Sequence, residues 1–183
     1  LDAAARQVRV AAIRETFEEC GVLLARERGA TELVGGARFR ALERRYRERI
    51  HGEEIGLVAM AEAEGLVLAF DALVPFAHWT TPEVSPRRYD THFFLVVVPS
   101  DQQPEHDGVE SVDSLWITPR AALAEGDAGR RAVVFPTRRN LEKLARSSTV
   151  AEAVAAARAD RIVTVLPVVE PDDAGVLMLR IPV

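Results

Sequence analysis

The sequence has a single cysteine, no long hydrophobic run and no excess of positive charge. Cys20 alone excludes an internal disulfide framework and a cysteine-rich zinc site. No apolar stretch approaches the ~20 residues that a membrane-spanning helix needs, so the sequence excludes a membrane protein. Because 23 Lys and Arg face 28 Asp and Glu, for a net charge of −5, a nucleic-acid-binding protein is disfavoured.

The remaining composition is that of a globular protein, with 48% hydrophobic and 28% charged residues. Its 183 residues have the length of one domain, so we predict a single domain over 1–183. The chain begins at Leu1 inside a stretch that we predict to be helical. We therefore expect that part of a longer product, including the first strands of the domain, precedes it.

The hydrophobic pattern predicts helices in the first third of the chain. Three- and four-residue steps from Val10 to Leu24 predict a helix over Ala3–Ala25, in which Gly21 requires an explanation because glycine costs ~1 kcal/mol there. A helical excursion follows over about 26–64. Its main helix, which His51-Gly52 ends, has six arginines between Arg38 and Arg49 and one apolar face, formed by Phe39, Leu42, Tyr46 and Ile50. A further helix is predicted over Glu53–Ala63.

The rest of the chain alternates between strand and helix patterns, which predicts a mixed α/β domain. β-Branched and aromatic residues predict strands over Val74–Thr81, Thr91–Val98, Ser111–Ile117, Ile162–Val169 and Gly175–Ile181, the last two joined by a turn at 171–175. Helices are predicted to begin at Thr118-Pro119 and to cover Thr137–Arg146 and Thr149–Ala159.

The first predicted helix carries three carboxylates on one face. At 100° per residue, Glu15, Glu18 and Glu19 share one third of the circumference, opposite the apolar stripe. Like charges at these spacings destabilise a helix by ~0.2–0.5 kcal/mol per pair, and a divalent cation would compensate for this repulsion. Arg14, four residues before Glu18, is placed to hold that carboxylate in one rotamer. The alternative interpretation is an ordinary solvated helix face.

The string R-E-x-x-E-E-x-G at 14–21 resembles the second half of the Nudix box, with Thr16 at an apolar position of that motif. Uninterrupted spacing of the first half would require glutamate at Arg6 and glycine before Leu1, so that half is either degenerate or separated by an insertion. Four further segments, at 78–82, 87–94, 113–116 and 136–141, resemble the Nudix branch that includes peroxisomal coenzyme A diphosphatases and bacterial relatives.

This resemblance implies an α/β fold, a Nudix-like α/β/α sandwich with a mixed sheet, to which the helical excursion is added. It implies hydrolysis of the diphosphate linkage in a nucleoside diphosphate derivative, such as a coenzyme A-like or ADP-ribose-like molecule. Mg²⁺ or Mn²⁺ would be held by Glu15, Glu18 and Glu19, while Glu15, Glu18 and Arg14 form the catalytic set. The alternative is a Nudix-like module that binds a nucleotide without hydrolysing it.

Several other residues are weaker candidates, each with a structural alternative. Arg87 and Arg88 could bind a diphosphate, and the alternative is a plain surface pair. Glu110, with Asp113, could add a carboxylate to the metal site, and the alternative is a solvent-facing strand edge. His78 and His92 are more typical of packed core histidines, and Cys20 of a buried thiol. The arginine-rich helix is more typical of a solvated, ion-paired face, although it could bind an anion or build a homodimer contact. The alanine, arginine and valine content is typical of a GC-rich bacterial genome, so we expect a cytoplasmic enzyme.

Overall fold

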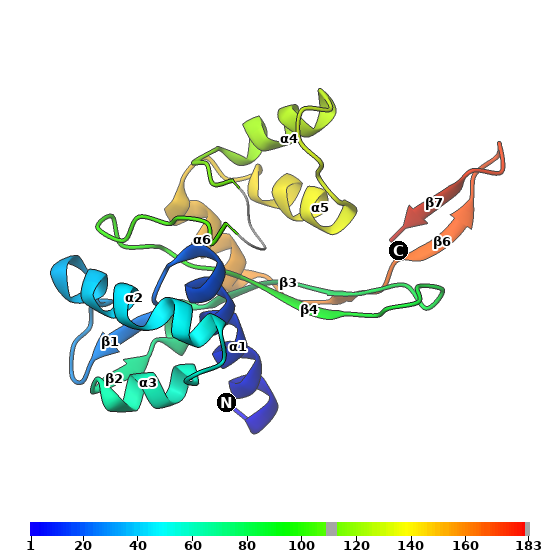
Figure 1. The fold of residues 1–183 in the computed structure, drawn as a ribbon. Coiled ribbons are helices and arrows are strands. Elements are labelled where there is room, and N and C mark those ends of the chain that lie inside the picture. Colours follow the sequence, from blue (N-terminus) through cyan, green and yellow to red (C-terminus); the bar gives the residue numbers. More distant parts are fainter. Residues whose placement is uncertain (109–112, 182–183) are drawn as a thin grey trace. The chain divides into compact units, whose positions relative to one another are not determined.

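The structure, a computed structural model, describes residues 1–108 and 113–181. Contacts divide the chain into two compact units (Figure 1). Unit 1 comprises Leu1–Leu73 and Val96–Leu115, and unit 2 comprises Val74–Leu95 and Trp116–Val183. The expectation of one domain with a helical excursion about 26–64 stays a prediction. Within the described residues, no helix has the length and apolar character to cross a membrane.

Unit 1 contains three α-helices and a short antiparallel ladder (Figure 1). The helices are α1 (Ala3–Cys20), α2 (Gly36–His51) and α3 (Leu57–Ala63), and η1 (Phe70–Ala72) is a 3₁₀ turn. Strands β1 (Ala25–Glu27) and β2 (Leu66–Leu68) pair in the register Arg26 opposite Val67. Helix α1 packs against α2 and α3, and α3 against β2. The unit is therefore a helical layer built around a two-stranded ribbon.

The core of unit 1 confirms the apolar stripe predicted for α2. The four predicted side chains of α2 are at most 3% exposed, and α1 contributes Ile13 and Phe17, both fully buried. The chain that follows α1 buries Val22, Leu23, Leu24 and Ala25 in succession, as expected for a segment covered on both sides. Gln102, only 2% exposed, fastens the 96–115 segment to this core. Its amide group bonds both backbone groups of Leu23 and the carbonyl of Val34.

Two sequence predictions in unit 1 need correction, and one element of the unit was not predicted. Helix α1 ends at Cys20 rather than Ala25, because Gly21 adopts φ +66° and reverses the chain, so Leu24 is not part of the helix. The helix predicted over Glu53–Ala63 starts only at Leu57, since Glu53 has φ +56° and interrupts the backbone. The ladder of β1 and β2 was not predicted at all, because three residues are too few for a periodic pattern.

Unit 2 has a mixed three-stranded sheet of order β4-β3-β5, in agreement with the predicted α/β class. Its strands are β3 (Val74–Thr80), β4 (Asp90–Leu95) and β5 (Thr164–Val165). Strand β3 pairs antiparallel with β4 and parallel with β5. Helix α6 (Val150–Ala159) packs on β3, and the core there consists of Val74, Phe76 and Ala157 with partly buried neighbours.

The remaining elements of unit 2 are a helix pair and a hairpin. Helices α4 (Pro119–Asp127) and α5 (Phe135–Leu144) pack together, and β6 (Val168–Pro171) pairs with β7 (Leu177–Arg180). The predicted start of α4 is confirmed, since the Thr118 hydroxyl accepts from the Ala121 amide at 3.2 Å.

Two strand predictions in unit 2 need correction. The strand predicted over Ile162–Val169 is divided into β5 and β6, and Pro167, which has no N–H to donate, lies in the interruption. Of the strand predicted over Ser111–Ile117, residues 111 and 112 lie outside the described part. Residues 113–117 form no strand; they are exposed, and hydrophobic residues favour a strand only where a partner completes the ladder.

Candidate functional site

Helix α1 brings its three glutamates to the last two turns before the reversal at Gly21. Glu15 is exposed, Glu19 is half-buried, and Glu18 is buried at 6% exposure. The C-terminal end of a helix carries the negative end of its dipole, so carboxylates are unfavourable there. Burial of a charged group is a further cost unless it is paired. The end of α1 is therefore a concentrated negative site that requires cations.

Arg14 is the first of these cations. Its guanidinium donates to the Glu18 carboxylate at 2.6 Å and also pairs with Glu15. The hydrogen bond to Glu18 is the main cause that raises the pKa of Arg14. This arrangement agrees with the prediction that Arg14 fixes the rotamer of Glu18. Since the carboxylate is nearly buried, the pair holds it more firmly than a solvent-exposed ion pair would.

Arg47 of α2 is the second cation, and it binds the backbone of α1 rather than the carboxylates of the three α1 glutamates. It donates to the carbonyl of Glu18 at 3.0 Å, to that of Glu19 at 3.1 Å and to that of Glu105 at 2.6 Å. The first two carbonyls belong to the last turn of α1, which has no helical partners for them. Arg47 therefore caps α1 and ties it to α2 and to the 96–115 segment.

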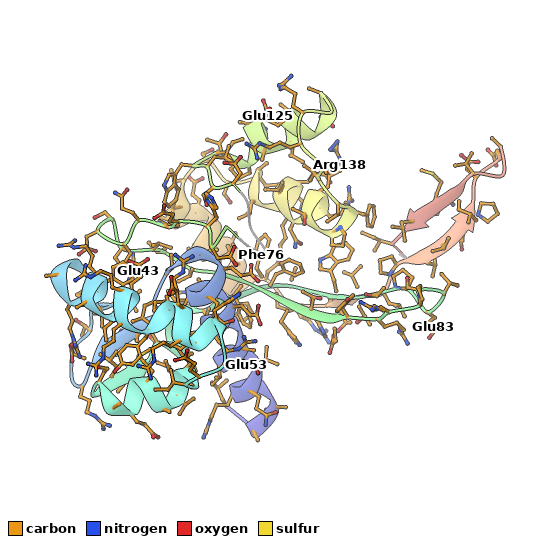
Figure 2. All side chains as sticks on the ribbon, viewed as in Figure 1. Glu43, Glu53, Phe76, Glu83, Glu125 and Arg138 are labelled. Carbon is orange, nitrogen blue, oxygen red and sulfur yellow. The ribbon has the colours of Figure 1, made fainter. Side chains whose placement is uncertain are left out.

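This cap explains why position 21 is glycine. Its φ of +66° is costly for any residue with a side chain, and a Cβ there would lie 2.8 Å from both the Arg47 guanidinium and the Glu43 carboxylate. Glu43 comes from α2, where Figure 2 labels it, and its carboxylate lies 3.7 Å from Arg47. Glycine is thus required both by the turn and by the close approach of α2.

A cavity of about 380 Å³ lies in unit 1 beside Glu18. It is lined by Glu18, Arg47, Glu48, His51, Gly52, His106 and Asp107. The lining combines carboxylates with an arginine and two imidazoles, a composition suited to a charged ligand. Of the predicted glutamates, Glu18 lines this cavity.

The donor set of α1 fits Mg²⁺ or Mn²⁺, which take carboxylate oxygens. The three glutamates are not already gathered around one point, however. Within residues 1–108 and 113–181, the group whose ligand atoms all lie within 4.8 Å of one another is a different one, His78, Asp90 and His92. Glu15 and Glu18 instead turn toward Arg14.

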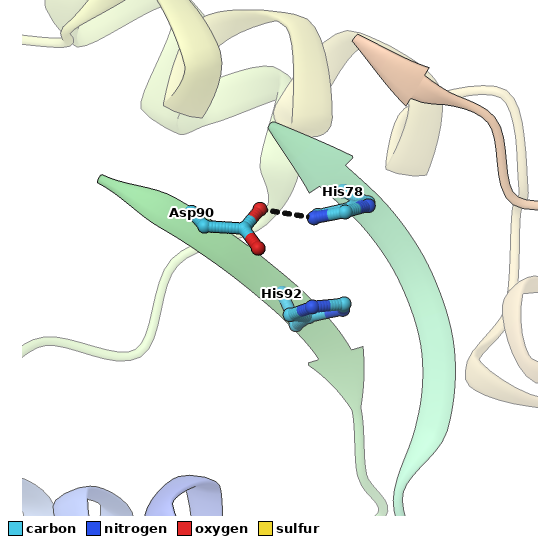
Figure 3. Close-up of side chains that lie close together, drawn as sticks. All are labelled: His78, Asp90 and His92. Carbon is cyan, nitrogen blue, oxygen red and sulfur yellow. Dashed lines mark hydrogen bonds and ion pairs between the residues drawn. The ribbon is translucent and has the colours of Figure 1, made fainter. Parts of the chain in front are cut away.

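The histidine prediction is wrong, because neither ring is packed in the core. His78 of β3 is half-buried and His92 of β4 is exposed, and both lie on one face of the sheet with Asp90 (Figure 3). This cluster was not predicted from the sequence. The i, i+2 spacing of Asp90 and His92 indicates a shared face, but the register that brings His78 opposite His92 is set only by the fold.

The buried-thiol prediction for Cys20 is also wrong. The residue is exposed, because α1 ends there and the stripe does not continue. Partial desolvation raises the pKa of the Cys20 thiol, and the nearby Glu19 carboxylate raises it further. A raised pKa lowers the thiolate fraction, so the thiol is a poor nucleophile.

The remaining candidates belong to other segments of the chain than α1, and one lies outside the described residues. Arg87 and Arg88 are exposed in unit 2, between β3 and β4, and Arg88 donates to the carbonyl of Thr81 at 3.2 Å. Asp113 is exposed, and Glu110 lies outside the described residues. The arginine-rich face of α2 is largely paired with carboxylates, at Arg38, Arg45, Arg47 and Arg49. This favours the interpretation of that face as an ion-paired surface.

Comparisons with known proteins agree with the motif at the end of α1. The family model of the NUDT19 Nudix domain matches residues 3–128. Two relatives named acyl-coenzyme A diphosphatase NUDT19 are similar, from Gallus gallus at 31% identity over 63% of this chain and 34% of that protein, and from Xenopus laevis at 27% over 64% and 33%. A putative nudix hydrolase 7 from Caenorhabditis elegans is 28% identical over 75% of this chain and 44% of that protein.

A solved structure also resembles this fold. A Nudix hydrolase from Alicyclobacillus acidocaldarius superposes with a TM-score of 0.72 at 27% identity, covering 85% of this chain and 68% of that one. The chain spans about a third of the length of the two diphosphatases and less than half of the nematode protein.

Proposed function

The chain belongs to the NUDT19 Nudix domain family, and from this we propose that it is a metal-dependent pyrophosphohydrolase of nucleoside diphosphate derivatives. The observation that carries the proposal is the position of Glu18. This carboxylate is nearly buried and accepts a hydrogen bond from Arg14. Together with Arg47, Glu18 lines a cavity of about 380 Å³. A surface glutamate would not require such support, whereas a metal ligand does.

Cleavage of a diphosphate requires that the charge on its phosphates be neutralised and that a water molecule be activated. We propose that Glu15, Glu18 and Glu19 hold Mg²⁺ or Mn²⁺, which supplies this neutralisation when bound. Glu15, or its neighbour Glu18, accepts the proton of the attacking water, a contribution of typically ~10²–10⁴-fold in rate. Arg14 is a positioning residue, since it fixes the orientation of Glu18.

Arg47 contributes indirectly by keeping the glutamates at a defined helix end. Its bonds to the carbonyls of Glu18 and Glu19 keep the last turn of α1 from fraying. Substrate-positioning groups must be held to within a fraction of an ångström for phosphoryl chemistry. We expect Arg47 variants to lose both the helix end and the activity.

For the substrate, we propose a coenzyme A-like or ADP-ribose-like molecule. Support comes from the two relatives named acyl-coenzyme A diphosphatase. Arg87 and Arg88 stay candidates for substrate binding, because guanidinium groups suit diphosphate oxygens, and Glu110 stays a candidate from the sequence alone. A cytoplasmic location, the lack of a nucleic-acid partner and a homodimer contact on α2 stay predictions from the sequence. The non-hydrolysing alternative is not favoured, since the relatives are named as hydrolases.

The proposal is tested by measuring mononucleotide release from coenzyme A, an acyl-coenzyme A and ADP-ribose, with Mg²⁺ or Mn²⁺ present. Glu18→Gln preserves the size of the side chain but removes its charge, and we expect it to lower the rate by about 10²-fold or more. Glu62→Gln is the matched control, because Glu62 is an exposed residue of α3 that is not part of the Glu18 cavity lining. No release by the wild-type chain from any of the three substrates would refute the proposed activity, and full activity of Glu18→Gln would refute the role of Glu18.

A further inference from the structure

Two strands of unit 2 bring three metal-binding side chains to one face of the sheet (Figure 3). His78 of β3 lies directly opposite His92 of β4, and Asp90 lies two residues before His92. Side chains directly opposite and diagonal across an antiparallel pair share a face and are within reach of one another. Trp79, on the other face of β3, is buried.

The three side chains are in contact. The imidazole rings are stacked with centroids 3.9 Å apart and an interplanar angle of 12°. His78 Nε2 is also paired with the Asp90 carboxylate. One ligand atom from each residue can be chosen so that all three lie within 4.8 Å of one another. An ion with bonds of ~2.0–2.1 Å brings its donors to within about 4.2 Å and binds in the plane of each imidazole ring, so the exposed His92 ring must rotate out of the stack to direct a nitrogen at the ion.

Thr164 of β5 contacts the other ring nitrogen of His78. Its hydroxyl lies 2.8 Å from Nδ1 of His78, on the ring nitrogen that faces away from Asp90. Histidines that bind a metal through one nitrogen usually donate the N–H of the other to an oxygen, which fixes the tautomer. A proton on Nδ1, donated to Thr164, leaves the lone pair of Nε2 directed at the cluster. This hydrogen bond is an independent observation, because it comes from a third strand.

From this arrangement we propose that His78, Asp90 and His92 form a binding site for a divalent transition-metal ion of the zinc class. Two imidazoles and one carboxylate suit Zn²⁺, Cu²⁺, Ni²⁺ or Co²⁺, whereas Mg²⁺ prefers an all-oxygen set. Only 17% of the His78 side chain is exposed but 66% of that of Asp90, so the site is anchored on one side and open to water on the other. A water molecule can complete the four-coordinate shell on the open side.

The ion would take the place of the direct contact between His78 Nε2 and the Asp90 carboxylate, and it would cross-link β3 to β4. Because such a site forms only in the folded chain, binding stabilises unit 2 by mass action. The proposal uses none of the residues proposed for hydrolysis, since its ligands belong to unit 2 and the glutamates of α1 to unit 1.

The experiment is a calorimetric titration of the full chain with Zn²⁺ in excess Mg²⁺, which occupies oxygen sites. We expect one Zn²⁺ to bind, and His92→Ala and Asp90→Asn to weaken its binding at least about tenfold. Thr164→Val, which keeps the shape but removes the hydroxyl, should weaken binding by about tenfold as well. Asp90→Asn retains the size of the carboxylate, so it serves if His92→Ala fails to fold, as judged by circular dichroism.

Two control variants separate this site from other zinc ligands. Glu18→Gln removes a carboxylate of α1, and Cys20→Ser removes the only thiol. Both should bind Zn²⁺ with unchanged affinity, and Zn²⁺ should raise the melting temperature of both as it does for the wild type. The proposal is overturned if the wild type binds Zn²⁺ no better than His92→Ala, or if Cys20→Ser or Glu18→Gln loses the binding instead.

Discussion

Replacement of Gly21 by alanine tests whether the end of α1 is built by the close approach of α2. The left-handed conformation of a residue with a Cβ costs roughly 1–2 kcal/mol. In addition, the new Cβ would lie 2.8 Å from the Arg47 guanidinium, which must move away from the α1 carbonyls. A hydrogen bond to a charged donor contributes about 1.5–3 kcal/mol. We therefore expect Gly21→Ala to lower the free energy of unfolding by about 2.5–5 kcal/mol.

Gly65 provides a matched control. Its φ of +69° is close to the +66° of Gly21, but nothing lies within 4 Å of the position that its Cβ would occupy. Gly65→Ala should therefore cost only the conformational part, roughly 1–2 kcal/mol. Urea unfolding followed by far-ultraviolet circular dichroism measures both losses. Equal losses for the two variants would refute the argument that Arg47 crowds position 21.

The same reasoning predicts an interaction between positions 21 and 47. In an Arg47→Ala background, the guanidinium no longer occupies the space beside Gly21, so the added methyl group should cost less than in the wild type, with only the Glu43 carboxylate left close to it. Residues in contact show non-additive effects of about 0.5–3 kcal/mol in such cycles. Strict additivity of the two substitutions would contradict the contact on which this explanation depends.

Two further predictions concern the core and the surface of unit 1. Gln102→Leu should cost at least about 3 kcal/mol by urea unfolding, because it leaves both backbone groups of Leu23 buried without their side-chain partner; a loss below about 1 kcal/mol would refute this. The Tyr46 hydroxyl donates to Glu64 and is the main cause that lowers the pKa of that carboxyl in the folded chain. The stabilising contribution of ionised Glu64 is therefore complete above the ordinary carboxyl pKa and is lost as the pH falls toward the lowered pKa of the folded chain. Glu64→Gln should reduce the dependence of the unfolding free energy on pH in the acid range. An unchanged dependence on pH in that range would contradict this.

The sequence predicted well those elements whose pattern repeats over several turns. Apolar side chains recur at four positions on one face of α2, from Phe39 to Ile50, and all four are buried. The start of α4 was predicted because a threonine N-cap followed by proline is a local signal, which does not depend on distant residues.

Features that depend on distant partners could not be predicted. Gly21 is a local signal for the end of α1, but nothing local shows that Arg47 of α2 bonds the carbonyls of its last turn. Strand β1 depends on β2, about 40 residues later in the chain, for its ladder. The exposed hydrophobic residues from Leu115 to Ile117 carry a strand-like pattern, but the structure gives them no partner strand.

The candidate site likewise has features that local sequence predicts and features that depend on distant residues. The spacing of Glu15, Glu18 and Glu19 and the role of Arg14 follow from helix geometry alone, and the structure has the Arg14–Glu18 bond. That Glu18 becomes buried beside a cavity depends on residues of α2 and of the 96–115 segment. The cluster of His78 with His92 depends on strand register, which no local pattern specifies.

The central claim is that the carboxylates at the end of α1 hold the divalent ion used in hydrolysis. Binding of Mn²⁺, followed by the loss of the electron paramagnetic resonance signal of the free ion, tests this most directly. We expect the wild type and the exposed-surface variant Glu62→Gln to bind Mn²⁺ with equal affinity, and Glu18→Gln to bind at least about tenfold more weakly. Equal binding by all three proteins, with Glu18→Gln correctly folded, would contradict the account.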